Sequence, residues 1–351
     1  MKGSGRFPAA CLLAAFLVTS LAPGQDREKL AQTGFQFLSV VSDARAAALG
    51  EAMTSLRTGS SALFFNPASL SDMDGILDIT ASTNQWIADI RHVTFSAAFN
   101  PAHGDFGCFA LSVQSVDYGE LLGTRVSVAN PLGYEDTGVF SLKALALGIG
   151  YAKQLTDRFS AGGHVRWVHQ DLGQSTIATN IREVYPGTDS AYRVADASVV
   201  DNKLSPLVFD FGTRFKTGLG SLVFGMSVRN FSTDVSYASE GFQAPLMFTL
   251  GISMDLMDLS DLIGERPTGQ QLYCSIDASH HRDHPEQVKV GLEYGFMNLL
   301  SLRAGYASSN NDETGFSYGI GVSQFGFSFD YAYTRYGIFG TVHRMTARFS
   351  H

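Results

Sequence analysis

The feature that most constrains the fold of this chain is a two-residue alternation that runs through its second half. In the run EQVKVGLEYGF at 286–296, large apolar residues alternate with glutamine, lysine, glycine and glutamate. The runs SLVFGMSVRNF at 221–231 and QFGFSFDYAYT at 324–334 repeat the pattern. Because successive side chains of a strand point to opposite faces, each run predicts a β-strand with one apolar face and one small or charged face.

This alternation fits two architectures. In a soluble sandwich the apolar face lies inside and the charged face lies outside. In a membrane barrel the arrangement is inverted, with the apolar face toward lipid and the small or charged face toward the lumen. The alternation alone does not separate the two.

Three further observations favour the membrane barrel. About 14 strand-like runs follow one another from position 76 to the C-terminus, and most approach the roughly 9–11 residues that a tilted membrane strand needs. Short gaps such as 154–157 alternate with long ones, Asp117–Gly138 and Leu172–Leu204, as turns and loops do at the two rims of a barrel. The last run, TVHRMTARFSH, places Phe349 on its apolar face. The sequence therefore predicts an all-β fold, a 14-stranded antiparallel transmembrane outer-membrane β-barrel.

The composition agrees with such a barrel. Charged residues make up 17% of the chain, below the roughly 25% of an average soluble domain. Past the N-terminus no run of about 18 apolar residues occurs, so no membrane helix is predicted. The net charge is -8 and no basic stripe is present to neutralise phosphates, which argues against binding to nucleic acid. The predicted barrel has outer-membrane lipids as its expected surroundings.

The N-terminus has the pattern of a secretory signal peptide. Lys2 and Arg6 precede an apolar stretch at 7–21, and Ala22 and Gly24 form a small-x-small cleavage pattern. We therefore expect a signal peptide at 1–24, a lead-in and hatch at 25–75, and the barrel at 76–351. Such a chain leaves the cytoplasm, and the expected location is the Gram-negative outer membrane.

The stretch from Ser42 to Met73 differs from the rest because it is Ala-rich and helix-permissive. A small non-β segment ahead of a long β array predicts a hatch, or plug, inside the barrel lumen. The residues that mark it are Arg45, Gly50, Asn66, Pro67 and Ala68. Pro67 holds Asn66 in extended geometry and ends the preceding element, while the Asn side chain can satisfy backbone groups at the turn. The same tripeptide also fits an ordinary helix-ending turn.

Alternation places a mixed set of charges on the lumen side of the predicted wall. The candidates are Arg166, Asp210, Arg214, Arg229, Asp277, Lys289, Glu293, Arg303, Asp330 and Arg348. Both signs are present, so ion pairs could join hatch and wall, whereas a selective pore more often shows one sign. The alternative, that several are merely hydrated, remains open. Lumen faces of glycine, serine and charge also count against a greasy ligand pocket.

Two segments outside the strands draw attention. The predicted loop at 173–204 is unusually apolar and is a candidate partner-binding surface; its markers are Ile177, Ile181, Tyr185 and Tyr192. HHRDH at 280–284 could ligate a transition metal, but a short exposed turn is not pre-organised, and a solvated turn is the simpler reading. Rim aromatics are expected in a lipid-facing girdle, among them Trp86, Tyr118, Trp167, Tyr294, Tyr306 and Tyr333.

No catalytic motif occurs in the structural context that it requires. A Ser-His-Asp elbow, HExxH, a P-loop and GxGxxG are all missing from the sequence in that sense. We therefore predict no enzymatic activity, no catalytic residues, no metal and no cofactor.

With these features in place, the chain resembles the PorV/PorQ family, relatives of the FadL-type outer-membrane barrels. The matching stretches are DARAAALGEAMTS, Asn66-Pro67-Ala68, NQWIADIRHVTFS at 84–96 and the closing HRMTARFS. The resemblance implies a barrel with an internal hatch, periplasmic termini and a role in type IX secretion. There, such barrels bind the C-terminal signal domain of secreted cargo or belong to the cell-surface attachment complex.

Three functions follow from these expectations. The first is a non-enzymatic component of the type IX secretion system that binds secreted cargo proteins or other components of that system through its surface loops. The alternative is a FadL-like transporter of hydrophobic small molecules, in which the hatch moves aside to open a lateral route. A third is a purely structural barrel that organises its neighbours in the envelope.

Overall fold

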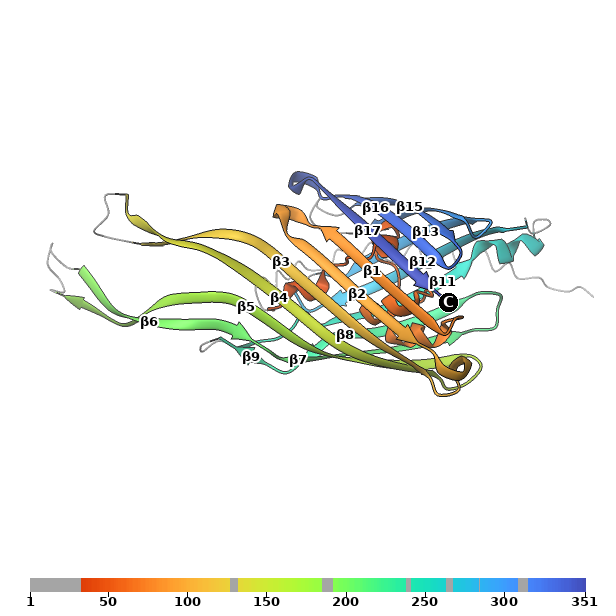
Figure 1. The fold of residues 1–351 in the computed structure, drawn as a ribbon, viewed down its shortest axis with the longest axis horizontal. Coiled ribbons are helices and arrows are strands. Elements are labelled where there is room, and N and C mark those ends of the chain that lie inside the picture. Colours follow the sequence, from red (N-terminus) through yellow and green to blue (C-terminus); the bar gives the residue numbers. More distant parts are fainter. Residues whose placement is uncertain are drawn as a thin grey trace, which may run out of the picture.

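The computed structural model describes residues 33–126, 132–184, 192–237, 241–262, 268–283, 285–308 and 315–351. These residues form an antiparallel barrel with the N-terminal segment inside it (Figure 1). The strands are β1 (Leu77–Gln85), β2 (Arg91–Phe99), β3 (Cys108–Val126), β4 (Tyr134–Gln154), β5 (Phe159–Val184), β6 (Tyr192–Leu204), β7 (Leu207–Lys216), β8 (Val223–Ser232), β9 (Val235–Ser236), β10 (Gly241–Phe242), β11 (Met247–Asp255), β12 (Gln270–His281), β13 (Gln287–Phe296), β14 (Leu300–Ala307), β15 (Phe316–Gln324), β16 (Phe327–Arg335) and β17 (Thr341–Ser350). The helical segments are η1 (Gln36–Ser39), α2 (Ala44–Ala48), η2 (Gly59–Phe64), η3 (Pro67–Asp72), η4 (Ile87–Asp89), η5 (Pro101–Gly104), η6 (Leu256–Leu262) and η7 (Gly337–Phe339).

The barrel is closed by pairing of the first strand with the last. β1 pairs with β2 on one side and with β17 on the other, and β4 pairs with β5, so the sheet returns on itself. The sheet contains 15 strands, but β6 and β7 follow one another along the same side of β5, so the wall has 14. The predicted 14-stranded barrel with an internal hatch is confirmed. Within the described ranges, no helix has the length and hydropathy needed to span a bilayer.

Side chains are distributed as in a membrane barrel and not as in a soluble sandwich. In β2, His92, Thr94 and Ser96 are buried, whereas Val93 and Phe95 are 44% and 42% exposed. The other wall strands repeat this inverted pattern, with phenylalanine, leucine and tyrosine outside. Because large apolar side chains cover the outer surface, that surface is suited to lipid.

The predicted long loops are wrong in their structure. We expected loops at Asp117–Gly138 and Leu172–Leu204, but in the described parts of these segments β3 and β4 pair in the first and β5 and β6 pair in the second. β4 and β5 pair only up to Lys143 and Asp171, so beyond that level the chain forms two separate two-stranded ribbons. They project from the left of the barrel (Figure 1). Paired backbone amides and carbonyls satisfy one another, which makes a ribbon more favourable than a loop of this length.

The two rims differ in their connections. Tight turns such as those after β7 and β15 lie at one end, which we call the short-turn rim. The C-terminus lies there as well, where the carbonyl oxygen of His351 accepts the amides of Ile76 (2.6 Å) and Leu77 (2.9 Å). The ribbons and the turns after β12 and β16 lie at the opposite end, the long-hairpin rim.

The hatch fills the lumen with short helices and turns. α2 packs against β14 to β17, whereas η3 packs against β4, β5 and β7, on the other side of the barrel. Wall and hatch meet backbone to backbone at Gly305: a Cβ there would stand 2.0 Å from the amide nitrogen of Gly50. Gly50 itself has a φ of 61°, which favours glycine. Glycine is therefore required on both sides of this contact.

Local sequence explains where the hatch helices begin. Asp43 caps α2, and its side chain accepts the amide of Ala46 at 2.8 Å. Asn66 caps η3 in the same way, with its side-chain oxygen accepting the amide of Ala68 at 3.1 Å. Pro67 occupies the first position of that helix, where no amide donor is needed.

Candidate functional site

The lumen contains an apolar compartment near the long-hairpin rim. We call it the lumen apolar cluster; its buried members are Phe35, Phe37, Leu38, Val116, Ala144, Ala146, Val168, Val208 and Ala244. The first three come from the hatch and the next five from β3, β4, β5 and β7. Sequence reasoning missed this compartment, because alanine and valine on a lumen face look like small filler residues. The lumen faces thus include apolar side chains as well as the predicted glycine, serine and charge.

The hatch segment that covers the cluster is residues 33–42, which we call the strap. It carries no charged residue. Wall side chains hold it through its backbone carbonyls: Gln114 Nε2 donates to Phe37 O at 2.8 Å, and Arg344 Nε donates to Val41 O at 2.9 Å. Asn84 Nδ2 donates to the same Val41 oxygen at 3.0 Å. The strap is thus pinned at intervals and without ion pairs in the described part of the chain.

The rest of the hatch, residues 43–75, is held much more firmly, and we call it the base. Arg45 forms a two-pronged ion pair with Glu293, with both nitrogen–oxygen distances at 2.8 Å. Glu293 also pairs with Arg303, and Glu51 accepts from Lys289 Nζ at 2.8 Å. Charge-assisted bonds of this kind are about twice as strong as neutral ones. The base is therefore the fixed part of the hatch.

Buried ion pairs shift the pKa values of two charged side chains in the base of the hatch, Arg45 and Glu51. Burial by itself disfavours the charged form of Arg45, but the paired Glu293 carboxylate outweighs it and raises the pKa of Arg45. For Glu51, burial raises the pKa, yet the ion pair and hydrogen bond with Lys289 lower it below the usual value of 4.5. Both groups are thus charged at neutral pH.

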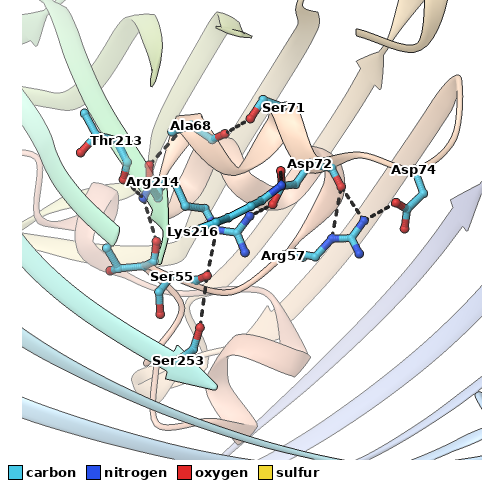
Figure 2. Close-up of polar contacts among 12 residues, drawn as sticks. Ser55, Arg57, Ala68, Ser71, Asp72, Asp74, Thr213, Arg214, Lys216 and Ser253 are labelled. Atoms are coloured by element: carbon cyan, nitrogen blue, oxygen red, sulfur yellow. Dashed lines mark hydrogen bonds and ion pairs between the residues drawn. The ribbon is translucent and has the colours of Figure 1, made fainter. Parts of the chain in front are cut away.

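A second set of ion pairs joins the base to β7 near the short-turn rim (Figure 2). Asp72 pairs with Arg214 and, at 2.7 Å, with Lys216 Nζ. Arg57 donates to the carbonyl oxygen of Asp72 at 2.7 Å and pairs with Asp74. Because the Asp72 and Arg214 side chains are each only 5% exposed, this contact is shielded from water.

The Asn-Pro-Ala motif lies against β7 beside these ion pairs. Asn66 Nδ2 donates to the carbonyl oxygens of Thr54 (2.7 Å) and Thr213 (3.0 Å), so one amide joins hatch to hatch and hatch to wall. A Cβ at Gly212 would stand 1.9 Å from Asn66 Oδ1, so glycine leaves room for this side chain. Ala68 is fully buried. The motif acts as an anchor of the base in this structure.

The structure places the ten candidate charges on the lumen side, and each has a partner. Arg214, Lys289, Glu293 and Arg229 contact the hatch, as does Asp277, whose Oδ2 accepts the amide of Thr54 at 2.9 Å. The remaining pairs lie within the wall: Arg166 with Asp210, Arg303 with Asp330, and Arg348 with Asp78. Five of the ten candidates thus contact the hatch, and the other five form pairs within the wall.

A hydrogen-bonded chain under the base has the connectivity of a charge-relay triad. Ser112 Oγ lies 2.8 Å from His164 Nε2, and His164 Nδ1 lies 2.9 Å from Asp210 Oδ2. Ser112 is only 3% exposed, and a Cβ at Gly148 would stand 2.6 Å from its oxygen. An acyl group has no space there. Asp210 also accepts from Arg166 Nη2 at 2.7 Å, so the chain fixes wall side chains in place.

A small cavity separates strap, base and wall. Its lining includes Val41 of the strap, Phe64 of the base, and Arg166 and Asn230 of the wall. The volume of about 20 Å³ is close to that of a water molecule and far too small for an aromatic ring. In this structure the cavity between strap, base and wall therefore has no room for a ring compound.

The wall next to the cluster contains a break in strand pairing, which we call the seam. β8 pairs with β7 only as far as Val208 and Ser232. On the side of this pair toward the long-hairpin rim, Pro206 separates β6 from β7 and has no amide to donate. There the connection from β8 to β11 takes the place of a strand, and its Ala244 enters the cluster. Among the described residues, no strand-to-strand hydrogen bonds join the two sides of the wall at this point. Apolar side chains pack there instead.

The strap also plugs the seam from inside. The amide of Gly34 donates to Gln243 O at 3.0 Å, and Thr33 forms a parallel bridge with Gln243. The Phe35 and Phe242 rings lie 6.1 Å apart between centroids. On the outside of the barrel, Leu207 and Phe231 are 52% and 53% exposed. The strap and the cluster thus meet the connection at the seam, and exposed apolar side chains of β7 and β8 lie on its outer side.

Other candidates lie elsewhere. Ile177 and Ile181 lie in β5 and Tyr192 begins β6, while Tyr185 is outside the described residues. His280 is exposed and His281 buried, because they point to opposite faces of β12, so HHRDH does not bring these two rings together. Among the described residues, no three potential metal ligands converge. His284 is not described.

The aromatic girdle is only partly as expected. Trp167, Tyr306 and Tyr333 are exposed on the outer surface. Trp86 instead lies 5.3 Å from the Arg344 guanidinium, over the lumen, and Tyr118 packs against the lumen apolar cluster. Their positions at strand ends could not reveal this, since rim residues turn inward as readily as outward.

Sequence reasoning also missed three residues that hold the hatch or the wall. Arg344 is 1% exposed and holds the strap, although it shares a strand face with Arg348 and could have been found by alternation. Asp78 pairs with Arg348 and alternates with Thr80 in β1, which is the same signal. Asp72 lies in an irregular segment that has no period to read.

Comparisons with known proteins identify the type of barrel. No family model matches the sequence, and no curated protein matches it. Among solved structures, the chain is similar to a monoaromatic hydrocarbon channel, CymD, with a TM-score of 0.55, 13% identity, and coverage of 88% of this chain and 97% of that one. For the Ralstonia pickettii toluene transporter TbuX, the TM-score is 0.52 and the identity 12%, with coverage of 88% of this chain and 98% of that one. A Pseudomonas aeruginosa FadL homologue has the same TM-score, identity and coverage of both chains.

These identities are low, so the likeness establishes the fold alone. The chain has the fold of FadL-type outer-membrane barrels. The finer resemblance to PorV/PorQ remains a prediction.

Proposed function

We propose that the protein is an outer-membrane channel for hydrophobic small molecules, in which the strap moves aside and the base stays fixed. One observation carries the proposal: the apolar compartment near the long-hairpin rim is covered by a strap that carries no charge, whereas the base, which buries apolar residues of its own, is tied to the wall by ion pairs. A hatch needed only to fill space gains nothing from this division. Fold likeness to a monoaromatic hydrocarbon channel and a toluene transporter supports the same reading.

The proposed route begins at the long-hairpin rim. Gln170 lies there between two tyrosines: its Nε2 donates to Tyr118 Oη at 3.3 Å, and its Oε1 accepts from Tyr237 Oη at 3.5 Å. Tyr118 borders the cluster. A hydrophobic molecule passes these uncharged groups, enters the cluster when the strap leaves, and crosses the seam into the lipid. Lateral exit avoids the base, whose ion pairs are costly to break.

The compartment suggests the substrate class. In the closed state it holds the rings of Phe35 and Phe37, each 2% exposed, so a molecule with one or two rings fits in their place. No cluster member is charged. The substrate is therefore an uncharged or weakly polar ring compound.

Locking the strap tests this function. Thr33 and Gln243 form a bridge, so Thr33→Cys with Gln243→Cys, in a background with Cys108→Ala and Cys274→Ala, places two thiols at a spacing suited to a disulfide. Uptake of radiolabelled toluene by cells that lack other hydrocarbon channels should stop in the oxidised protein and return after reduction. The two single-cysteine variants are the controls. Equal uptake by the locked and reduced forms would overturn the proposal.

A second candidate is the type IX secretion role, with the ribbons binding cargo or partner proteins. The observation that favours it is the apolar, exposed surface of the β3–β4 ribbon beyond the rim, with Leu122 63% and Val139 62% exposed. Under this candidate the protein belongs to the PorV/PorQ kind. Gentle purification from native outer membrane should then yield secreted proteins that share a C-terminal domain; their absence, together with ring-compound uptake, removes it.

Both candidates share one arrangement in the envelope. We infer a cleaved signal peptide at 1–24, a hatch at 25–75 ahead of the barrel, and both termini in the periplasm. Short turns at the rim that holds the C-terminus support this orientation, since periplasmic turns are short in such barrels. Protease treatment of intact cells should cut the ribbons and spare a tag at the C-terminus.

A further inference from the structure

The strap is tied to the long-hairpin rim at a carboxylate. Thr33 Oγ1 donates to Asp283 Oδ2 at 2.8 Å, and Gln36 Nε2 donates to the same oxygen at 2.6 Å. Gln36 Nε2 also lies 2.5 Å from Thr33 Oγ1. Asp283 belongs to HHRDH, the turn between β12 and β13 that no other part of the proposed mechanism uses.

We infer that Asp283 is a positioning residue that latches the strap over the lumen apolar cluster and so controls access to it. The inference rests on the proposed function, because it assigns the control of that same site. The ligand contacts Phe35 and Phe37, whereas Asp283 acts on them through Thr33 and Gln36.

The position of the latch makes it effective. Thr33 and Gln36 flank Phe35, and Phe37 follows directly, so both rings move when this end of the strap is released. The next anchors along the strap are at Phe37 and Val41, and they hold it near the base. Release of Asp283 therefore leaves the outer end of the strap attached through the neutral bond from the Gly34 amide to Gln243 O, so that end lifts more often, while the inner end stays attached to the wall.

The turn that carries Asp283 is itself fastened to the seam. The amide of Arg282 donates to Leu246 O at 3.1 Å, in the connection that also receives the Gly34 amide at Gln243. His280 Nδ1 lies 3.1 Å from Glu286 Oε1 across the base of the turn. Turn, connection and strap thus meet at one place, and a movement of the turn is transmitted to the plug of the seam.

The chemistry of the latch differs from that of the other anchors. A carboxylate oxygen that accepts two bonds holds its donors more strongly than a neutral acceptor does. The two donors are uncharged, so the strap crosses no ion-pair barrier when it leaves. Such a latch suits a segment that must open repeatedly, whereas the ion pairs of the base suit a segment that must not.

A buried cysteine reports the position of the strap. Val208 is fully buried beneath the strap, so Val208→Cys in the background with Cys108→Ala and Cys274→Ala reacts with a methanethiosulfonate reagent only when the strap lifts. Adding Asp283→Ala should raise the labelling rate about tenfold, since two hydrogen bonds to a charged acceptor are lost. Asp283→Asn keeps one acceptor oxygen and should give a smaller rise.

Two controls give the experiment its direction. Glu286→Gln removes the charge of another carboxylate next to this turn but keeps a side-chain oxygen for the His280 contact, so it should leave the rate unchanged. Thr33→Val should raise the rate on its own but add little to Asp283→Ala, because both remove the same bond. Gel mobility of the unheated protein checks that each variant remains a folded barrel.

The outcomes separate the latch from the proposed function. If Asp283→Ala labels no faster than the parent or than Glu286→Gln, the latch is overturned, whatever the uptake of toluene. If Asp283→Ala speeds labelling in a protein that takes up no ring compound, the latch stands and the transport function fails. Additive effects of Thr33→Val and Asp283→Ala would also contradict the latch.

Discussion

At the scale of single residues, Asp72 joins the base of the hatch to two cations of β7. It is buried with Arg214, whose guanidinium also donates to Ser55 O at 2.9 Å. Removing the carboxylate leaves a buried arginine without its counter-ion, which costs about 3–5 kcal/mol in comparable pairs. We expect Asp72→Asn to lower the free energy of unfolding by that order, measured by denaturant unfolding in detergent.

Asp74 provides the matched control for this prediction. It also pairs with a hatch arginine, Arg57, but its side chain is 86% exposed. An exposed pair contributes only about 0–1 kcal/mol. Equal losses for Asp74→Asn and Asp72→Asn would show that burial at the β7 contact does not determine stability.

The residues that sequence reasoning found and missed differ in a physical way. Wall residues such as Lys289 and Glu293 could be assigned because a strand in a membrane barrel has an inside and an outside, and the two alternate. Hatch residues such as Asp72 follow no such rule, because short 3₁₀ turns change direction every few residues. Their roles depend on which wall strand they meet, and that is set by the closed barrel as a whole.

At the scale of elements, the ribbons explain why two predicted loops are strands. Adjacent Leu121 and Leu122 are 42% and 63% exposed, so both faces of the β3–β4 ribbon are open to the surroundings. Beyond the rim the ribbon borders neither lumen nor hatch, so its residues do not need to alternate between apolar and polar. Strand pairing continues there because backbone hydrogen bonds do not depend on it, and the sequence looks like an apolar loop.

The β3–β4 ribbon should be dispensable for the barrel. Above Lys143 and Asp171 it pairs with neither β2 nor β5. Replacing residues 121–140 by Asn-Gly, a favoured two-residue turn, is expected to leave the unfolding midpoint unchanged within experimental error and toluene uptake intact. If uptake is lost although the barrel remains folded, the ribbon belongs to the transport route; if a secreted protein no longer co-purifies, it belongs to the second candidate function.

At the scale of the whole molecule, ion pairs join the hatch to β7 and β13, and they should make stability depend on pH. The pKa of Glu51 is lowered below 4.5 in the folded protein, although burial alone would raise it, because Lys289 favours the carboxylate. Its stabilisation is therefore fully present above about pH 4.5 and is lost as the pH falls through the lower, folded value. We expect about 2 kcal/mol from this pair.

Glu51→Gln isolates that contribution. The difference in unfolding free energy between the parent and the variant should be largest near neutral pH and should shrink on acidification. Denaturant unfolding at a series of pH values measures it. A difference that is constant across the series would mean that the Glu51 carboxylate does not stabilise the hatch through its charge.

The overall architecture could be predicted because lipid outside and a polar hatch inside impose opposite demands on alternate residues. The division of the hatch into strap and base could not, since it depends on which backbone carbonyls meet Gln114 and Arg344 across the lumen. The seam at Pro206 was equally hidden, because a proline at the end of an apolar run looks like the start of an ordinary strand.

Closure of the ring by β1 and β17 links the assembly of the barrel to the placement of the hatch. The hatch precedes β1 in the chain, yet it is enclosed with the help of β17, the wall strand farthest along the chain, which pairs with β1 from Asp78–Ser350 to Gln85–His343. The Arg348–Asp78 contact lies on this joint, and a Cβ at Gly59 of the hatch would stand 2.3 Å from Arg348 Nη2. The hatch therefore packs directly against this joint, which makes its placement in the lumen and the pairing of β1 with β17 dependent on each other.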